Sequence, residues 1–191
     1  KKAVAYLLEE GISEMTLRPL ARKTGTSARL LVYHFGSKER LIAAAINEVQ
    51  AHFQRFFADA FRRCNAISRK QVLMVFWKWT TRPQNLPYFR LLFEVQALAL
   101  QNPARYGPSI SNTASGWLAL IEKVLPPSSK RRARATLCAA VFDGLIIELL
   151  ATGERRRITA ALEEFNRLLV TIPPARRTTG SINKRRARAK K

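Results

Sequence analysis

Residues 16–41, TLRPLARKTGTSARLLVYHFGSKERL, carry the start and stop signals of three consecutive helices. Thr16, Ser27 and Ser37 are N-cap candidates, because a short hydroxyl side chain can accept a hydrogen bond from a free N–H group of the first helical turn. Gly25 stands where it can end the first helix in the left-handed conformation that glycine adopts without strain. We therefore predict short helices over 17–24 and 28–35 and a third helix that begins at Lys38.

The first of these short helices separates apolar from charged side chains. Leu17, Leu20 and Ala21 share one face, which turns Arg18 and Arg22 outward. Two short helices joined by a tight glycine-containing turn, the second capped by serine and carrying arginine, are typical of a helix-turn-helix, whose second helix enters the major groove of DNA. The pattern therefore indicates a DNA-reading unit.

Further helices are predicted on both sides of this unit. Residues 3–10 have an apolar face and are followed by Gly11, a stop signal. The helix that begins at Lys38 keeps apolar residues at helical spacing as far as Phe57, about six turns. This length exceeds what a DNA-reading unit needs, so we expect the helix to connect the unit to the rest of the chain.

The remaining sequence contains no alternating strand pattern and reads as helices separated by proline. We predict helices over about 68–81, 87–100, 109–125, 129–152 and 154–172. The helix over 129–152 becomes apolar all round, so it is expected to be covered on both sides. The predicted fold class is all-α, with about nine helices. The expected domains are a helix-turn-helix head at 1–45, a helical ligand-binding and dimerisation body at 46–172, and a tail at 173–191.

The formal net charge of +21 predicts attraction to polyanions through the release of counterions. Residues 173–191 contain eight Lys and Arg, no acidic residue and no apolar periodicity, and are expected to form a disordered basic tail that adds nonspecific DNA affinity, or a solvated appendage without a role. Nucleic acid is favoured over a membrane, because no separate cationic amphipathic helix is present. The alternative is an arginine-rich composition without a binding role.

Few residues are available for catalysis or metal binding. Cys64 and Cys138 are far apart without metal-binding spacing, and His34 and His52 are the only histidines. We expect no enzyme activity, no cofactor and no metal. No apolar run approaches the ~18 residues of a membrane span, and no signal peptide is recognisable, so a cytoplasmic protein is expected. Position 1 is not Met and already falls within a helical pattern, so further residues are expected before Lys1.

The pattern T-L-R-x-L-A-x-x-T-G-x-S-x-x-x-L-x-Y-H-F-G-S-K-E-x-L in residues 16–41 resembles the helix-turn-helix of the TetR/AcrR family of transcriptional regulators. The resemblance covers the first quarter to third of the chain; in the body it extends only to the helix number and an Asp143-Gly144-Leu145 segment. Val32 departs from the pattern, because family members frequently have tyrosine there. The resemblance implies DNA contacts by Thr16, Arg18, Thr26, Ser27, Ala28, Arg29, Tyr33, His34 and Lys38.

One recognition helix reads too few base pairs for specificity, so such heads are expected to act in pairs on two half-sites. The last two predicted helices have the small and apolar residues that a homodimer interface needs. The predicted interface residues are Ala140, Gly144, Leu145, Ile158, Leu162, Phe165 and Leu169. The alternative is that both helices only close the core of one chain.

Aromatic residues gather in the predicted body helices together with a few acidic groups, among them Glu94 and Glu148. An apolar cavity with a few polar groups is typical of a small-molecule site, although aromatics at helical spacing also form plain cores. The candidate ligand-binding residues are Trp77, Phe89, Phe93, Trp117, Phe142 and Asp143. The small-molecule effector itself is not specified by the sequence.

The favoured function is a dimeric transcriptional regulator, a repressor, that binds a palindromic operator in double-stranded DNA and is released by a small molecule. The alternative is a basic DNA-binding or DNA-compacting protein without ligand control. No nucleophile, base and orienting group stand together in the sequence in a way that would predict an enzyme.

Overall fold

The computed structural model describes residues 2–12, 15–63, 72–125 and 128–171. These residues form nine helices and no strand, so the all-α prediction is confirmed for the described part. The helices are α1 (Lys2–Glu10), α2 (Leu17–Thr24), α3 (Ala28–Phe35), α4 (Lys38–Arg63), α5 (Val72–Thr80), α6 (Leu86–Gln101), α7 (Pro103–Val124), α8 (Arg131–Thr152) and α9 (Arg155–Thr171). The predicted basic tail and Cys64 lie outside the described residues.

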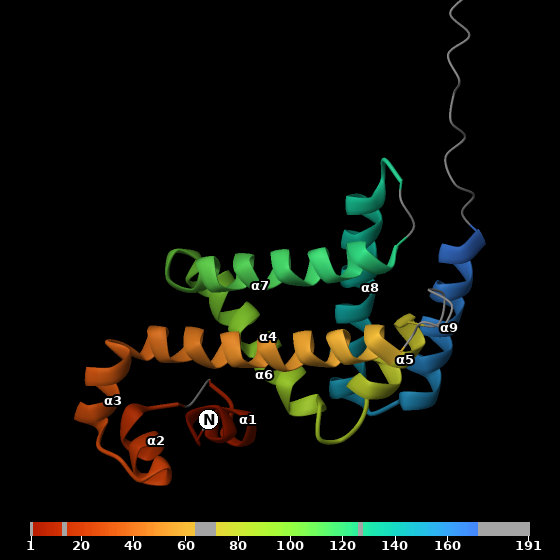
Figure 1. The fold of residues 1–191 in the computed structure, drawn as a ribbon. Helices are drawn as coiled ribbons and strands as arrows, with labels where there is room; N and C mark the ends of the chain where they lie inside the picture. Colours follow the sequence, from red (N-terminus) through yellow and green to blue (C-terminus); the bar gives the residue numbers. More distant parts are fainter. Residues whose placement is uncertain (1, 13–14, 64–71, 126–127, 172–191) are drawn as a thin grey trace, which may run out of the picture.

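Helices α1 to α3 gather at one end of the molecule against the start of α4, and we call this unit the head (Figure 1). Its core is formed by Leu7 and Leu20, both 0% exposed, with Leu31 and Leu41. Gly25 ends α2 with φ +72°, as the sequence predicts. The helix boundaries in the head follow from local capping signals and from one small apolar core.

Helix α4 is 26 residues long and joins the head to the other helices, which we call the body. At 1.5 Å per residue it spans about 39 Å. It packs on α1 and α3 in the head and on α7 in the body. Val49, near its middle, and Phe53, in its second half, are buried in the core, and the ring of Phe53 meets those of Phe89 and Trp117 in the body. One rigid element therefore contacts both parts of the molecule.

The predicted start of α7 near Ser109 is wrong, because the helix begins at Pro103 and continues through Pro108. Pro103 occupies the first helical position, where the missing N–H has no acceptor to lose. Pro108 removes a single hydrogen bond close to the start of the helix. Packing of α7 on α4, α6 and α8 holds the helix continuous despite that loss.

Helix α8 is apolar on two sides, and one chain covers only one of them. Ala135, Cys138, Phe142, Ile146 and Leu149 are buried on the inner side. On the outer side Leu137 is 50% and Ile147 48% exposed. The expectation that no apolar run approaches the length of a membrane span is wrong for α8, since one 18-residue window of it has a mean hydropathy of 1.8 and could by length and composition alone cross a membrane. The prediction that it is covered on both sides is therefore not met within one chain.

Candidate functional site

The outer face of α3 carries polar side chains that are open to solvent. Ser27 caps the helix, because its Oγ accepts the backbone N–H of Leu30 at 3.1 Å. Tyr33 is 81% exposed, and its ring meets the ring of His34 edge-on with centres 5.5 Å apart. Arg29 is exposed and forms no hydrogen bond or ion pair with another described residue. These groups are accessible to a ligand that approaches α3 from solvent.

The residues at the start of α2 are also accessible. Thr16 has the extended backbone of an N-cap residue, but its side chain makes no capping hydrogen bond. Arg18 is exposed, whereas Thr26 and Ala28 are half-buried beside α2 and α3. Val32, the departure from the family pattern, is 44% exposed on α3. That departure therefore changes the surface of the helix and leaves its core side intact.

Lys38 has a structural role besides the phosphate contact that the resemblance implies. Its Nζ donates a hydrogen bond to the backbone carbonyl of Met15 at 2.5 Å, and the side chain is half-buried. This bond ties the first residue of α4 to the segment that precedes α2. An ammonium group has three donors, so two remain for another acceptor.

Ion pairs in the head involve its acidic side chains and leave most of its cations free. Lys23 bridges Glu9 and Glu10 at 2.8 and 2.9 Å, and the hydrogen bond to Glu9 is the main cause of the raised pKa of Lys23. Glu39 pairs with Arg105 of α7 at 2.8 Å. Among the described residues, the cations of α2, α3 and the start of α4 that have no ion pair are Arg18, Arg22, Arg29, Lys38 and Arg40. The free charge of this surface is therefore positive.

A second candidate site is a cavity of about 300 Å³ between α5, α6, α7 and α8. Phe89, Phe93, Trp117, Phe142 and Asp143, predicted from the sequence as ligand-binding, all line it. Among the further lining residues are Phe76, Gln96, Thr113 and Thr136, which the sequence did not single out, and Ala140, which the sequence predicted for the dimer interface. Rings dominate the wall, with Phe76 stacked on Phe142 at 4.7 Å between centres.

Trp77, the other predicted ligand residue, lies outside the cavity lining. It is 2% exposed, and its Nε1 donates a hydrogen bond to Oγ1 of Thr159 at 2.9 Å. The indole thus joins α5 to α9. An aromatic side chain at helical spacing in α5 can point either to the cavity or to α9. The sequence pattern does not distinguish these two directions.

Two titratable groups line the cavity, and burial raises the pKa of both. Burial raises the pKa of the Asp143 carboxyl to about 6. The pKa of the Cys138 thiol is raised to about 11, also by burial, so this thiol stays protonated at neutral pH. Asp143 forms no hydrogen bond or ion pair with any described residue. The cavity therefore contains one ionisable carboxylate with which no described side chain is paired.

The predicted dimer residues divide between the surface and the core of one chain. Ala140 and Gly144 are exposed on α8, whereas Leu145, Phe165 and Leu169 are half-buried. Ile158 and Leu162 are 0% and 1% exposed, and they pack in the core of the chain itself. The side chains of Ile158 and Leu162 are therefore not available to a partner, because burial inside the monomer uses their apolar surface.

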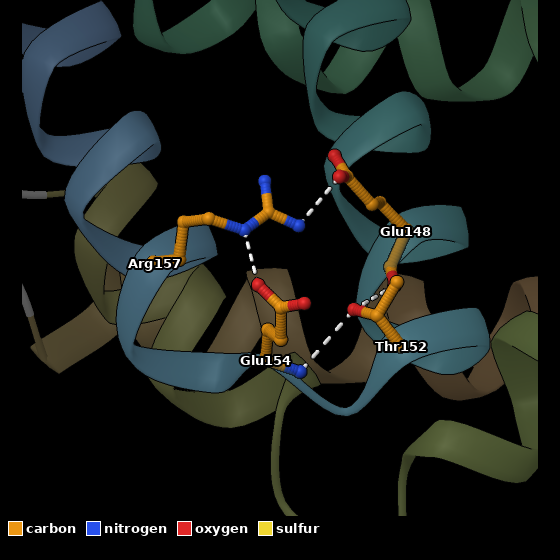
Figure 2. Close-up of polar contacts among 4 residues, drawn as sticks. All are labelled: Glu148, Thr152, Glu154 and Arg157. Atoms are coloured by element: carbon orange, nitrogen blue, oxygen red, sulfur yellow. Dashed lines mark hydrogen bonds and ion pairs between the residues drawn. The ribbon is translucent and has the colours of Figure 1, made fainter.

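A polar corner sets the position of α9 beside α8 (Figure 2). Arg157 donates hydrogen bonds to Glu148, at 2.6 Å, and to Glu154. Oγ1 of Thr152 accepts the backbone N–H of Glu154 at 3.2 Å and donates to the carbonyl of Glu148 at 2.8 Å. Glu148, considered from the sequence as a polar group of the ligand site, belongs to this corner instead.

Glu94 also lies away from the cavity, at the junction of head and body. Its Oε2 accepts the backbone N–H of Ile12. Arg90, one turn earlier on α6, donates to the carbonyls of Leu8 and Glu9 at 2.6 and 3.2 Å. Sequence reasoning did not identify this contact, because residues some eighty positions apart meet there. The end of α1 is thus fastened directly to α6.

Comparisons with known proteins match the head by sequence and most of the chain by fold. Residues 1–45 match the family described as "Bacterial regulatory proteins, tetR family". A search of curated proteins found no match. The sequence identity to the solved structures described next is below 25%, so their similarity concerns the fold.

Three solved structures show how far the fold is shared. A Rhodococcus protein assigned to the TetR family of transcriptional regulators is 18% identical, with a TM-score of 0.68 over 85% of this chain and 93% of that one. The multidrug binding protein EbrR in complex with proflavin is 24% identical, with a TM-score of 0.66 over 87% and 95%. FadR of Bacillus subtilis in complex with stearoyl-CoA is 15% identical, with a TM-score of 0.61 over 89% and 95%.

Proposed function

We propose that this chain, which carries a TetR-family DNA-binding head in the fold of TetR-family regulators, is a dimeric repressor that releases a palindromic operator when a small molecule fills the cavity. The family match and the shared fold support a DNA-binding transcriptional regulator. Repression is our inference from the family resemblance, and the dimer and the effector are our inference from the surfaces and the cavity described above. Such a protein would act in the cytoplasm, where the DNA of a bacterial cell lies.

The observation that carries the proposal is the surface around α3. An exposed arginine without an ion pair can form two hydrogen bonds to O6 and N7 of guanine, and Arg29 stands in the first turn of α3. Arg18, Arg22 and Arg40 add positive charge on the same head, without ion pairs to described residues. Phosphate contacts would fix the register of the head on the duplex, and α3 would read the bases.

A second head comes from a partner chain in this proposal. Leu137, Ala140, Gly144, Ile147 and Ala151 follow one another at steps of three or four residues along α8, and all five are exposed. We call this set the α8 stripe. Small residues within it allow two helices to approach closely, and apolar contact surface would be buried on pairing. Leu168 of α9, 52% exposed, extends the same kind of surface.

The cavity supplies the effector site of the proposal. EbrR and FadR, which share this fold, have been solved with proflavin and with stearoyl-CoA. Here the cavity lies between α5, α6, α7 and α8. Of these helices, α6 also contacts α1 of the head and α7 contacts α4. A ligand that prefers a different packing of these helices would shift the position of the two heads relative to one another.

Recovery of bound DNA fragments from cells tests the proposal and yields the operator. Arg29→Ala should weaken binding to the recovered operator at least tenfold, as expected for the loss of one bidentate base contact. Arg156→Ala is the matched control, because Arg156 is exposed on α9 and forms no described ion pair. Its operator affinity should stay within about twofold. Equal losses in both variants would indicate nonspecific charge instead.

A ligand-independent DNA-compacting protein remains the second candidate, favoured by the net charge of +21. It would coat DNA without a preferred site. Saturable protection of one palindromic site at moderate salt excludes this candidate, whereas uniform protection that fades with salt supports it. Deletion of residues 175–191, which lie outside the described residues, measures the share of the basic tail in the salt dependence.

A further inference from the structure

The cavity in the body has an unusual balance of apolar wall and charge. Five of its lining residues are aromatic: Phe76, Phe89, Phe93, Trp117 and Phe142. Asp143 is its single charged side chain, since no Lys, Arg, His or Glu occurs among the described residues that line it. A ligand in this cavity would therefore meet rings on several sides and one carboxylate.

Asp143 differs from the other half-buried acidic side chains that the structure describes. Glu94 accepts a backbone N–H, Glu39 pairs with Arg105, and Glu122 pairs with Arg132 at 3.2 Å. Asp143 has neither kind of partner among the described residues. Asp143 is half-buried, and a carboxylate that loses water without gaining a partner is unfavourable, so the chain either tolerates this cost or receives the partner from outside.

The charge state of Asp143 agrees with a partner from outside. Burial raises the pKa of this carboxyl to about 6, and no arginine or lysine opposes the effect. At pH 7.5 the group is still mostly ionised, because the pH exceeds that pKa. Desolvation without a counter-ion makes a carboxylate attract any cation that can enter the same apolar space.

The rings around Asp143 suit an organic cation better than a hydrated metal ion. The face of an aromatic ring attracts a cation within about 6 Å, most strongly where water is excluded. An apolar wall would also bury the hydrocarbon part of such a ligand. A metal ion would need several oxygen or nitrogen ligands, and the described lining offers a single carboxylate.

We propose that the cavity binds a hydrophobic organic monocation, whose charge pairs with Asp143 and whose apolar body lies against Phe93, Trp117 and Phe142. This inference rests on the proposed function, in which the cavity is the effector site. A single carboxylate specifies a single positive charge. A volume of about 300 Å³ fits a ligand with about two fused rings and a small cationic group.

The pH dependence of binding follows from the same pair. The cation binds the ionised carboxylate, so its affinity is highest above pH 6 and falls as Asp143 is protonated below that value. The elements packed around the cavity, α5, α6, α7 and α8, contribute one other titratable group among its described lining residues, Cys138. Its thiol has a pKa of about 11 and stays neutral between pH 5 and about pH 8.

Three probes of one shape test the charge preference. They are (2-naphthylmethyl)trimethylammonium, its neutral carbon analogue 2-neopentylnaphthalene, and the anion 2-naphthylmethanesulfonate. A quaternary ammonium does not titrate, so any pH dependence comes from the protein. Binding to the full chain is measured by naphthalene fluorescence at pH 7.5 and pH 5. The cation should bind at least tenfold more tightly than the neutral analogue at pH 7.5 and lose that advantage at pH 5.

Asp143→Asn keeps the shape of the side chain and removes its charge, so it should abolish the advantage of the cation and leave binding of the neutral analogue unchanged. Glu163→Gln removes the same charge from an exposed position on α9. It should change neither the advantage of the cation nor the affinity for the neutral analogue. The inference is overturned if the neutral or anionic probe binds as tightly as the cation, if Asp143→Asn keeps the preference, or if no probe binds.

DNA binding by the same variants separates this inference from the proposed function. Release of the operator by the neutral probe, with no preference for the cation, would overturn the ligand class and leave the ligand-responsive regulator standing. If the chain binds the cation through Asp143 but protects no specific DNA site, the ligand class stands and the proposed DNA-binding regulator is overturned. The variant Asp143→Asn should bind the operator as the unchanged chain does, because Asp143 lies in the body.

Discussion

Glu94 of α6 accepts the backbone N–H of Ile12, the residue that follows the last turn of α1 and Gly11. Arg90 of the same helix donates to the carbonyls of Leu8 and Glu9, which lie in that last turn of α1. The last carbonyls of a helix have no partner within it, and positive charge is favourable there. One turn of α6 thus supplies both the donor and the acceptor that the end of α1 needs, and α6 also lines the cavity.

The carboxylate of Glu94 occupies the space beside Gly11 that a side chain would need. The substitution Gly11→Ala tests whether this close approach contributes to stability. Gly11 has φ +80°, and a Cβ there would come within 2.9 Å of both carboxylate oxygens of Glu94. We expect the substitution to lower the free energy of unfolding by about 2–3 kcal/mol, since left-handed strain adds about 1–2 kcal/mol and the displaced hydrogen bond about 1 kcal/mol. Denaturant unfolding measures the change.

Gly25→Ala is the matched control for the backbone strain at Gly11. Gly25 has a similar φ of +72°, but a Cβ added there would meet no atom of another segment within 4 Å. It should therefore lower the free energy of unfolding by strain alone, about 1–2 kcal/mol. Equal losses at the two glycines would mean that Glu94 does not restrict the space at Gly11.

The sequence predicted the head more completely than the body, and particular residues show why. Ser27 and Gly25 act through bonds to residues close in the chain, so their pattern is sufficient to place α2 and α3. Trp77 and Glu94 have partners about eighty positions away, and helical spacing gives no information on such pairs. The start of α7 was missed because tertiary packing outweighs the local effect of Pro108.

The charge of Asp143 should reduce stability in the absence of a ligand. Burial raises its pKa from 3.8 to about 6, so the folded chain binds the proton more strongly than the unfolded chain. The ionised carboxylate lowers the free energy of unfolding by its full amount above about pH 6, and this loss disappears as pH falls towards 3.8. Asp143→Asn should therefore raise the free energy of unfolding by about 1–3 kcal/mol at pH 7.5 and by clearly less at pH 5. Urea unfolding at both values measures it; a gain independent of pH would contradict the assignment.

The α8 stripe predicts how a charge at the surface of α8 affects assembly. Ile147→Asp places a carboxylate on the open face, so sedimentation equilibrium should show monomers that keep the helical circular dichroism of the unchanged chain. Ile146→Asp, one residue earlier, is the contrasting variant, because Ile146 is 0% exposed and a buried charge there should prevent folding. A dimer that survives Ile147→Asp would move the interface away from the stripe.

The indole of Trp77 gives a test of how α9 is held beside α5. Trp77→Phe keeps most of the buried ring and removes the donor to Thr159, so the free energy of unfolding should fall by about 1–2 kcal/mol. Thr159→Val removes the acceptor and keeps the shape, and the double variant should lose less than the sum of the two single changes, because both remove one bond. Since Trp77 is outside the cavity lining, affinity for the naphthalene probes should stay unchanged in all three. Strictly additive losses would show that the two groups contribute independently, without a stabilising bond between α5 and α9.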